Sequence, residues 1–144
     1  MLLLLLLSAI HAAYAERVPD AARTGVDCAA AMTIALPNAR ITAVRAVVPN
    51  DSLRALGQRP YCQIEATIDS ETHIVALLPN DWNGRFLMGG AGGYVGDVQN
   101  QSESSVHEGY ATVGTDAGHS AFSLSAGWAL HNDQRIADFA YRAV

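Results

Sequence analysis

Five glycines lie within the eight residues from Gly89 to Gly96, and this loop has the clearest chemical potential in the sequence. A short apolar segment, residues 85–88, precedes the loop, and the pair Asn83–Gly84 before it has the composition of a tight turn. Glycine has no Cβ, so such a loop can bend sharply and bring backbone N–H groups close to a ligand. Three roles fit: binding a phosphate, donating to the oxyanion of an acyl transfer, or serving as a flexible connection.

The residues around the glycine loop argue against phosphate binding. A P-loop ends in Gly-Lys followed by Ser or Thr, and the chain contains no lysine. A dinucleotide-binding Gly-x-Gly-x-x-Gly motif starting at Gly90 requires a glycine where Val95 stands, and residues 97–101 are too polar to begin the expected helix. The oxyanion role and the flexible connection therefore remain.

Within these 144 residues we find no nucleophile for such a reaction. The Gly-x-Ser-x-Gly motif of serine hydrolases is absent, and around Ser125 a serine replaces the first glycine. Asp116 and His119 are three residues apart, a spacing more typical of a pair that ties down a loop than of a catalytic pair. The five histidines never recur at helical ligand spacing, so we expect no metal site.

Length and charge further limit the class of protein and its partners. The 144 residues suffice for one domain at most, and an apolar fraction of 50% with 16% charged residues is typical of a globular protein. The net charge is −5 and no basic cluster exists, so we expect neither nucleic acid nor an anionic membrane surface as a partner.

The first fifteen residues predict a signal peptide. Leu2–Ile10 is an apolar stretch too short to span a bilayer, and Ala13–Tyr14–Ala15 is a small-x-small cleavage site. We expect a mature domain of residues 16–144 that is secreted or periplasmic and not held by a membrane; a buried first helix is the alternative. In an exported protein Cys28 and Cys62 can form a disulfide, with two free buried thiols or, less favoured, a thiol nucleophile as alternatives.

The hydrophobic pattern predicts mostly strands before a final helix. The expected strands are Ala39–Val48, Tyr61–Ile68, His73–Leu78, residues 85–88 and Tyr110–Thr115. Residues 28–34 read as one or two helical turns, 51–60 as a polar connection, 98–108 as a loop or frayed helix, and 120–131 as irregular. Residues 133–144 have helical spacing without a stop signal, which predicts the opening of an α/β domain truncated before its later strands.

Several segments together resemble the N-terminal part of the tannase and feruloyl esterase family, which includes mono(hydroxyethyl) terephthalate hydrolases. In order they are LPNARIT (36–42), YCQIEATI (61–68), LPNDWNGRFLMGGAGGYVG (78–96), GYATVGTDAGH (109–119) and IADFAYRAV (136–144). The combination of the Trp-Asn-Gly-Arg-Phe-Leu segment, the glycine loop and the later Gly-Thr-Asp-x-Gly-His segment is specific, and the pieces cover nearly all of the mature chain.

The resemblance implies the N-terminal portion of an α/β-hydrolase fold that stops before the nucleophile elbow and the lid. The Ser-His-Asp triad, the aromatic-acid pocket and a calcium ion in the lid would all lie beyond Val144. Gly93 then corresponds to the oxyanion donor, with Gly92 lining the pocket beside it. Cys28 and Cys62 match the family's N-terminal disulfide, and Asp116 and His119 match a motif that we take as structural.

The implied activity is hydrolysis of a small aromatic ester, such as a feruloyl or galloyl ester, by a serine acyl-enzyme mechanism. The 144 residues alone are expected to be inactive. The alternatives are a non-catalytic exported binding module and an inactive orphan fragment.

Overall fold

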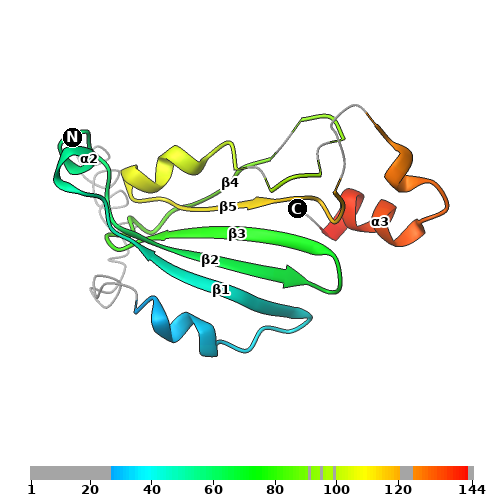
Figure 1. Ribbon diagram of the computed structural model, residues 1–144, viewed down its shortest axis with the longest axis horizontal. Helices are drawn as coiled ribbons and strands as arrows, with labels where there is room; N and C mark the ends of the chain where they lie inside the picture. The colour runs from blue at the N-terminus through cyan, green and yellow to red at the C-terminus, as the bar shows by residue number, and fades with distance from the viewer. Residues whose placement is uncertain (1–26, 91, 95, 99, 121–124, 143–144) are drawn as a thin grey trace, which may run out of the picture.

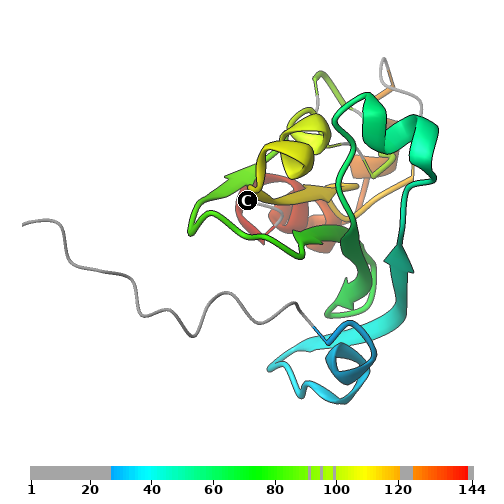
Figure 2. The same cartoon turned by 90° about the vertical axis from the view of Figure 1, so that its left-hand side faces the viewer.

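The computed structural model describes residues 27–90, 92–94, 96–98, 100–120 and 125–142. They form one mixed five-stranded sheet with the strand order β1-β2-β3-β5-β4 (Figure 1). The 3₁₀ helix η2 (Ala29–Thr33) lies beside β1, and the 3₁₀ helix η3 (Glu103–Glu108) packs against β3 and β5, so the two lie on opposite sides of the molecule (Figure 2). The expected signal peptide lies outside the described residues.

Three antiparallel strands make up the first part of the sheet: β1 (Ala39–Val47), β2 (Tyr61–Ile68) and β3 (Thr72–Pro79). The alternation that predicted β2 is confirmed, since Cys62 and Ala66 on its apolar face are buried. Asp69, in the tight connection to β3, has a positive φ of 50°, a conformation that aspartate tolerates better than most residues.

The strand β5 (Ala111–Thr115) lies between two neighbours of opposite direction. It is antiparallel to β3 and parallel to β4 (Phe86–Met88). Four of its five residues are buried, as its small and β-branched composition predicted. The outer strand β4 is exposed along its whole length, with Phe86 57% exposed.

Short helices connect the strands. Their bounds are η2 Ala29–Thr33, α2 Asp51–Ala55, η3 Glu103–Glu108, η4 Gly127–Ala129 and α3 Asp133–Ala137, which continues as the π-helical turn η5, Asp138–Arg142. The prediction of a plain polar connection at 51–60 is wrong for α2. Asn50 caps this helix, its side chain accepting a hydrogen bond from the Leu53 N–H at 3.0 Å. The predicted final helix begins at the expected residue but is regular for only five residues.

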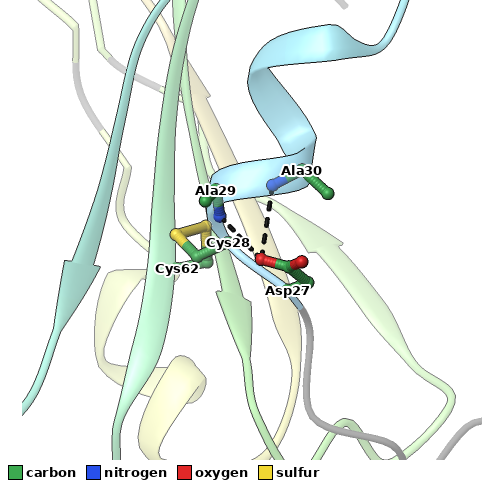
Figure 3. Close-up of a disulfide and its surroundings, with 5 residues drawn as sticks. All are labelled: Asp27, Cys28, Ala29, Ala30 and Cys62. Atoms are coloured by element: carbon green, nitrogen blue, oxygen red, sulfur yellow. Dashed lines mark hydrogen bonds between the residues drawn. A yellow bond between two sulfur atoms is a disulfide. The ribbon is translucent and has the colours of Figure 1, made fainter.

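Cys28 and Cys62 form a disulfide, so the free-thiol alternatives are excluded for this pair (Figure 3). The bond joins the start of η2 to the buried face of β2. Asp27 supports this junction because its carboxylate accepts hydrogen bonds from the N–H groups of Ala29 and Ala30 at 3.1 and 3.4 Å. The disulfide thus fastens the first helical turns to the sheet.

Candidate functional site

The turn before β4 is held against the segment that leads into β5. The Asn83 N–H donates to the Gly109 carbonyl at 2.9 Å, and the Asn83 side chain donates to the Glu108 carbonyl at 3.1 Å. Gly84 has a positive φ of 83°, as the Asn-Gly composition predicted. Trp82 closes the turn by donating its indole N–H to the Arg85 carbonyl at 2.7 Å. These contacts place β4 beside β5 and so direct the glycine loop towards the carboxyl ends of both strands.

The glycine loop begins in a crowded position that only glycine can occupy. The Gly89 N–H donates to the Val113 carbonyl at 2.8 Å, which extends the pairing of β4 with β5 by one residue. A Cβ at Gly89 would lie 2.3 Å from the Asn100 side-chain oxygen. Asn100 is itself fixed, since its amide donates to the Thr112 hydroxyl at 2.8 Å. The loop therefore leaves the sheet from a rigid base.

Beyond this base the loop is open. A Cβ at Gly90 or Gly92 would meet nothing within 4 Å. Gly93 has a positive φ of 67°, a conformation that side-chain-bearing residues rarely adopt. Gly92 and Gly93 are both exposed, so approach to their backbone is unobstructed by the described residues. The oxyanion role of these two glycines remains a prediction that this geometry allows.

The loop continues into an aromatic cluster made of Tyr94, His119, Trp128 and Phe139. The His119 ring stacks on Trp128 with a centroid distance of 3.8 Å and an interplanar angle of 16°. Phe139 lies 5.2 Å from Trp128 and 6.3 Å from Tyr94, so the cluster joins η4 and η5 to the loop. The His119 Nε2 is 3.1 Å from the Tyr94 carbonyl oxygen. The turn after β5 thereby contacts the glycine loop directly.

Asp116 faces away from His119 and towards β3. Its carboxylate accepts from the backbone N–H of His73 and of Gly118, each at 2.9 Å, and lies 2.7 Å from the His73 Nδ1. Asp116 is 6% exposed, whereas the His73 side chain is 59% exposed. Asp116 and His119 therefore bind different partners. These contacts attach the turn to β3 and to the glycine loop, and the structural role of the two residues stays a prediction.

Sequence reasoning missed the partnership of Asp116 with His73, which lies 43 residues earlier. The hydrophobic pattern predicted only that His73 lies in a strand. Its contact with Asp116 follows from the antiparallel register of β3 and β5. Asp138 was missed as well: it is 2% exposed, and a Cβ at Gly118 would lie 2.6 Å from its Cβ. Gly118 has a positive φ of 77°, and only a glycine fits against the helical turn η5, in which Asp138 lies. Close packing of this kind leaves no periodic signal.

Ser125 is exposed, and its hydroxyl accepts a hydrogen bond from the Gly127 N–H at 3.3 Å.

Within the described ranges, no group of three or more His, Cys, Asp or Glu side chains is arranged to hold a metal ion. The same part of the chain contains no helix with the length and apolar character needed to cross a bilayer.

Comparison with known proteins shows the family. The profile of the tannase and feruloyl esterase family matches residues 56–144, more than half of the sequence. The chain therefore belongs to this family, as the sequence motifs suggested.

Individual relatives agree with this assignment. Feruloyl esterase B of Aspergillus niger is 43% identical over 70 residues, which cover 48% of this chain and 13% of the relative. A probable feruloyl esterase of Arthroderma benhamiae is 28% identical over 151 residues, covering 93% of this chain and 28% of the relative. The crystal structure of feruloyl esterase B from Aspergillus oryzae matches with a TM-score of 0.62 and 28% identity over 85% of this chain and 26% of that one. The chain thus spans less than a third of the length of these relatives.

Proposed function

We propose that this chain is the N-terminal part of a secreted serine esterase of the α/β-hydrolase fold that cleaves esters of aromatic, phenolic acids such as feruloyl or galloyl esters. Family membership and the names of the relatives support an esterase that acts on such compounds. The activity belongs to the complete protein, because the 144 residues alone contain no Gly-x-Ser-x-Gly motif.

One observation carries the proposal: an exposed glycine loop follows β4, whose parallel neighbour β5 ends at the same edge of the sheet. In α/β-hydrolases one oxyanion donor is a backbone N–H in a loop that follows a strand of the sheet, and the other adjoins the nucleophile. Gly93 supplies the first donor, and Gly92 lines the pocket beside it. Both glycines are exposed and lie three and four residues beyond the fixed base at Gly89, as such a role requires.

The reaction would proceed in two steps. The serine oxygen attacks the ester carbonyl while a histidine takes its proton, and the resulting oxyanion accepts a hydrogen bond from the Gly93 N–H. Collapse expels the alcohol, which receives that proton, and water then hydrolyses the acyl-enzyme to the phenolic acid. The serine, histidine and aspartate of this triad lie beyond Val144. A calcium ion in the lid of the complete protein would also bind there.

The outer strand β4 supports a continuing chain. Phe86, Leu87 and Met88 are exposed by 57, 36 and 39%, although a parallel strand is normally covered on both faces. A further strand beside β4 and a helix over its face would bury these side chains. Such elements belong to the part of an α/β domain that follows the first helix.

The test is to extend the reading frame past the codon of Val144 and express the complete protein. We expect a Gly-x-Ser-x-Gly motif downstream and hydrolysis of methyl ferulate or methyl gallate, abolished when the motif serine is replaced by alanine. N-terminal sequencing of the exported protein should give a mature chain beginning at Glu16. A complete protein that contains the motif but cleaves no aromatic ester would overturn the proposal.

The absence of a nucleophile within the 144 residues leaves two alternatives, a non-catalytic binding module and an inactive fragment. A stop codon directly after Val144, together with a cooperatively folded product, would show a self-sufficient module without catalytic residues, as the binding-module reading requires. A stop codon with an unfolded product would establish the inactive fragment.

A further inference from the structure

The glycine loop is held at Gly89 and again at Tyr94. At its start the Gly89 N–H donates to the Val113 carbonyl at 2.8 Å. At its other end the Tyr94 carbonyl oxygen lies 3.1 Å from the His119 Nε2. Between these points a Cβ at Gly90 or Gly92 would touch nothing within 4 Å, so packing does not brace the loop there. The direction of the Gly93 N–H therefore depends on the two fastened ends.

His119 is well suited to hold its end. The side chain is buried, with 3% of the residue exposed, and its ring is stacked on Trp128 at 3.8 Å. Phe139 lies 5.7 Å from the same ring and limits its rotation from another side. Both ring nitrogens face carbonyl oxygens, Nε2 that of Tyr94 at 3.1 Å and Nδ1 that of Ala117 at 3.3 Å. A neutral imidazole carries one hydrogen, and the shorter contact assigns it to Nε2, which then donates to the Tyr94 carbonyl. The imidazole is thus a donor in a fixed orientation.

We propose that His119 is a positioning residue for ester hydrolysis: its Nε2–H bond to the Tyr94 carbonyl fixes the neighbouring Gly93 so that the Gly93 N–H points at the oxyanion. The inference rests on the proposed esterase function and assigns His119 no contact with substrate. Glycine loses more conformational freedom on ordering than any other residue. A glycine loop without this anchor would therefore spend part of its time with the donor misdirected.

Two variants of the complete esterase separate hydrogen bonding from packing. In His119→Gln the side-chain amide reaches about as far as Nε2 and keeps a donor, but the stacked ring is lost. In His119→Phe a ring remains to stack on Trp128, but the donor is lost. If His119 only fills space, the phenylalanine variant should be the more active of the two. If it positions the loop, the glutamine variant should be.

We expect His119→Phe to lower kcat about 10-fold with KM changed less than about twofold, because an oxyanion contact forms only in the transition state. His119→Gln should keep kcat within about threefold of wild type, since loss of stacking alone leaves the donor in place. A trifluoromethyl ketone analogue, whose serine adduct carries an oxyanion, should inhibit His119→Phe about 10-fold less strongly. Binding of the product acid, which makes no such contact, should be unchanged.

Equal kcat in His119→Phe and wild type, or higher activity in the phenylalanine than in the glutamine variant, would overturn the proposal while leaving the esterase function intact. Failure of the esterase function itself is seen separately, as an inactive wild-type protein. Should His119→Phe not fold, ¹⁵N NMR of histidine-labelled wild-type protein decides. A protonated, slowly exchanging Nε2 on His119 supports the anchor, and an unprotonated Nε2 excludes it.

Discussion

Asp116 and His119 lie in the same turn after β5, but their side chains contact different parts of the molecule. The Asp116 carboxylate accepts hydrogen bonds from His73 and Gly118 and so ties the turn back to β3. His119 faces forward, towards the Tyr94 carbonyl. The three-residue spacing that resembles a catalytic pair in the sequence therefore serves two separate attachments of one turn. Ala117 between them has a positive φ of 57°, which turns the chain between these two directions.

At Gly93 the backbone conformation leads to a first prediction. Gly93→Val in the complete esterase should lower kcat at least about 100-fold, since losing one oxyanion donor typically costs 10²–10³ in rate. The valine side chain disfavours the positive φ of 67° and blocks approach to the N–H. Kinetics with methyl ferulate, together with circular dichroism to check the fold, measure the effect.

Gly57→Val is the matched control for that substitution. Gly57 also has a positive φ, 85°, with nothing within 4 Å of a built Cβ, but it follows α2 and is distant in sequence from the loop. The backbone strain should cost about 1–2 kcal/mol of stability. Its kcat should stay at the wild-type value; equal losses of kcat in both variants would mean that strain, not the donor, is responsible.

Asp116 allows a second prediction. Asp116→Ala should lower the free energy of unfolding of the complete protein by about 2–3 kcal/mol, since removing a buried acceptor leaves the His73 and Gly118 N–H groups without their bonds. Urea unfolding measures the loss. Asp97→Ala, at an exposed position, is the control and should change stability by less than about 0.5 kcal/mol. A loss as small for Asp116 as for Asp97 would contradict the structural role.

At the scale of elements, the strands and the helical turns at residues 28–34 were predictable, whereas the short helix α2 was not. Period-two alternation in 61–68 and the small, β-branched residues of 111–115 report burial directly, so β2 and β5 were found within a residue of their observed bounds. The helix α2 was missed because its five residues are all exposed and carry no apolar face. Its signal is local: Asn50 in the N-cap position and Asp51 in the first turn.

The candidate site was likewise predictable only where its residues leave a signal in the sequence. The glycine loop was visible because glycine composition is itself the signal, and the disulfide because the chain has only two cysteines. The attachments of the loop were not visible. They join residues 25 positions apart, as in Tyr94 and His119, through a backbone carbonyl that any residue provides. Contacts of this kind depend on the register of the sheet, which the sequence pattern does not specify.

The ion pair between Glu71 and Arg135 joins the β2–β3 turn to α3 and gives a prediction about pH. Arg135 Nε lies 2.7 Å from the Glu71 carboxylate, and this hydrogen bond, with the positive charge, lowers the pKa of Glu71 from its ordinary value of 4.5. A carboxyl whose pKa is lowered by folding adds stability that is complete above pH 4.5. That stability is lost as the pH falls through the lowered value.

We therefore expect Glu71→Gln to be slightly less stable than wild type at pH 7, with the difference shrinking towards zero below pH 4. The effect should be small because both side chains are more than a third exposed. Urea unfolding of the complete protein at pH 7 and pH 3.5 measures it, with Glu103→Gln as an exposed control. A difference that grows on acidification would contradict the assignment.

The disulfide gives a second element-scale prediction. Cys28 and Cys62 are 34 residues apart, and a loop of this length predicts a stabilisation of about 3–4 kcal/mol from the restricted unfolded chain. The double substitution Cys28→Ser with Cys62→Ser should lose about this amount in urea unfolding of the complete protein. A loss of less than about 1 kcal/mol in the double variant would contradict this prediction.

For the whole molecule, the uncovered parts of the sheet matter more than any single contact. Exposed apolar side chains occur on β4 and again on the C-terminal helical segment, where Ile136 is 46% and Tyr141 80% exposed. An open strand edge next to apolar surface favours association between chains. The exposed apolar surfaces of β4 and of the C-terminal helical segment are therefore of the kind that additional residues of a longer chain would cover.

We expect residues 16–144, expressed alone, to unfold without a cooperative transition and to bind the dye ANS, as loosely packed chains with exposed apolar surface do. The complete protein should unfold cooperatively and bind little dye. Thermal scans followed by circular dichroism, with ANS fluorescence alongside, compare the two. A sharp transition in the short chain would show a self-sufficient module.

The position of β5 also sets an order of assembly. The chain completes β4 before it reaches β5, yet β4 pairs only with β5 among the described strands, and β5 needs β3 on its other side. The meander β1–β2–β3 can form from local contacts before the rest of the sheet, and the disulfide can lock it early. The segment 86–96 must then wait, unpaired, until β5 has docked. The part of the molecule proposed to do chemistry is therefore among the last to take shape.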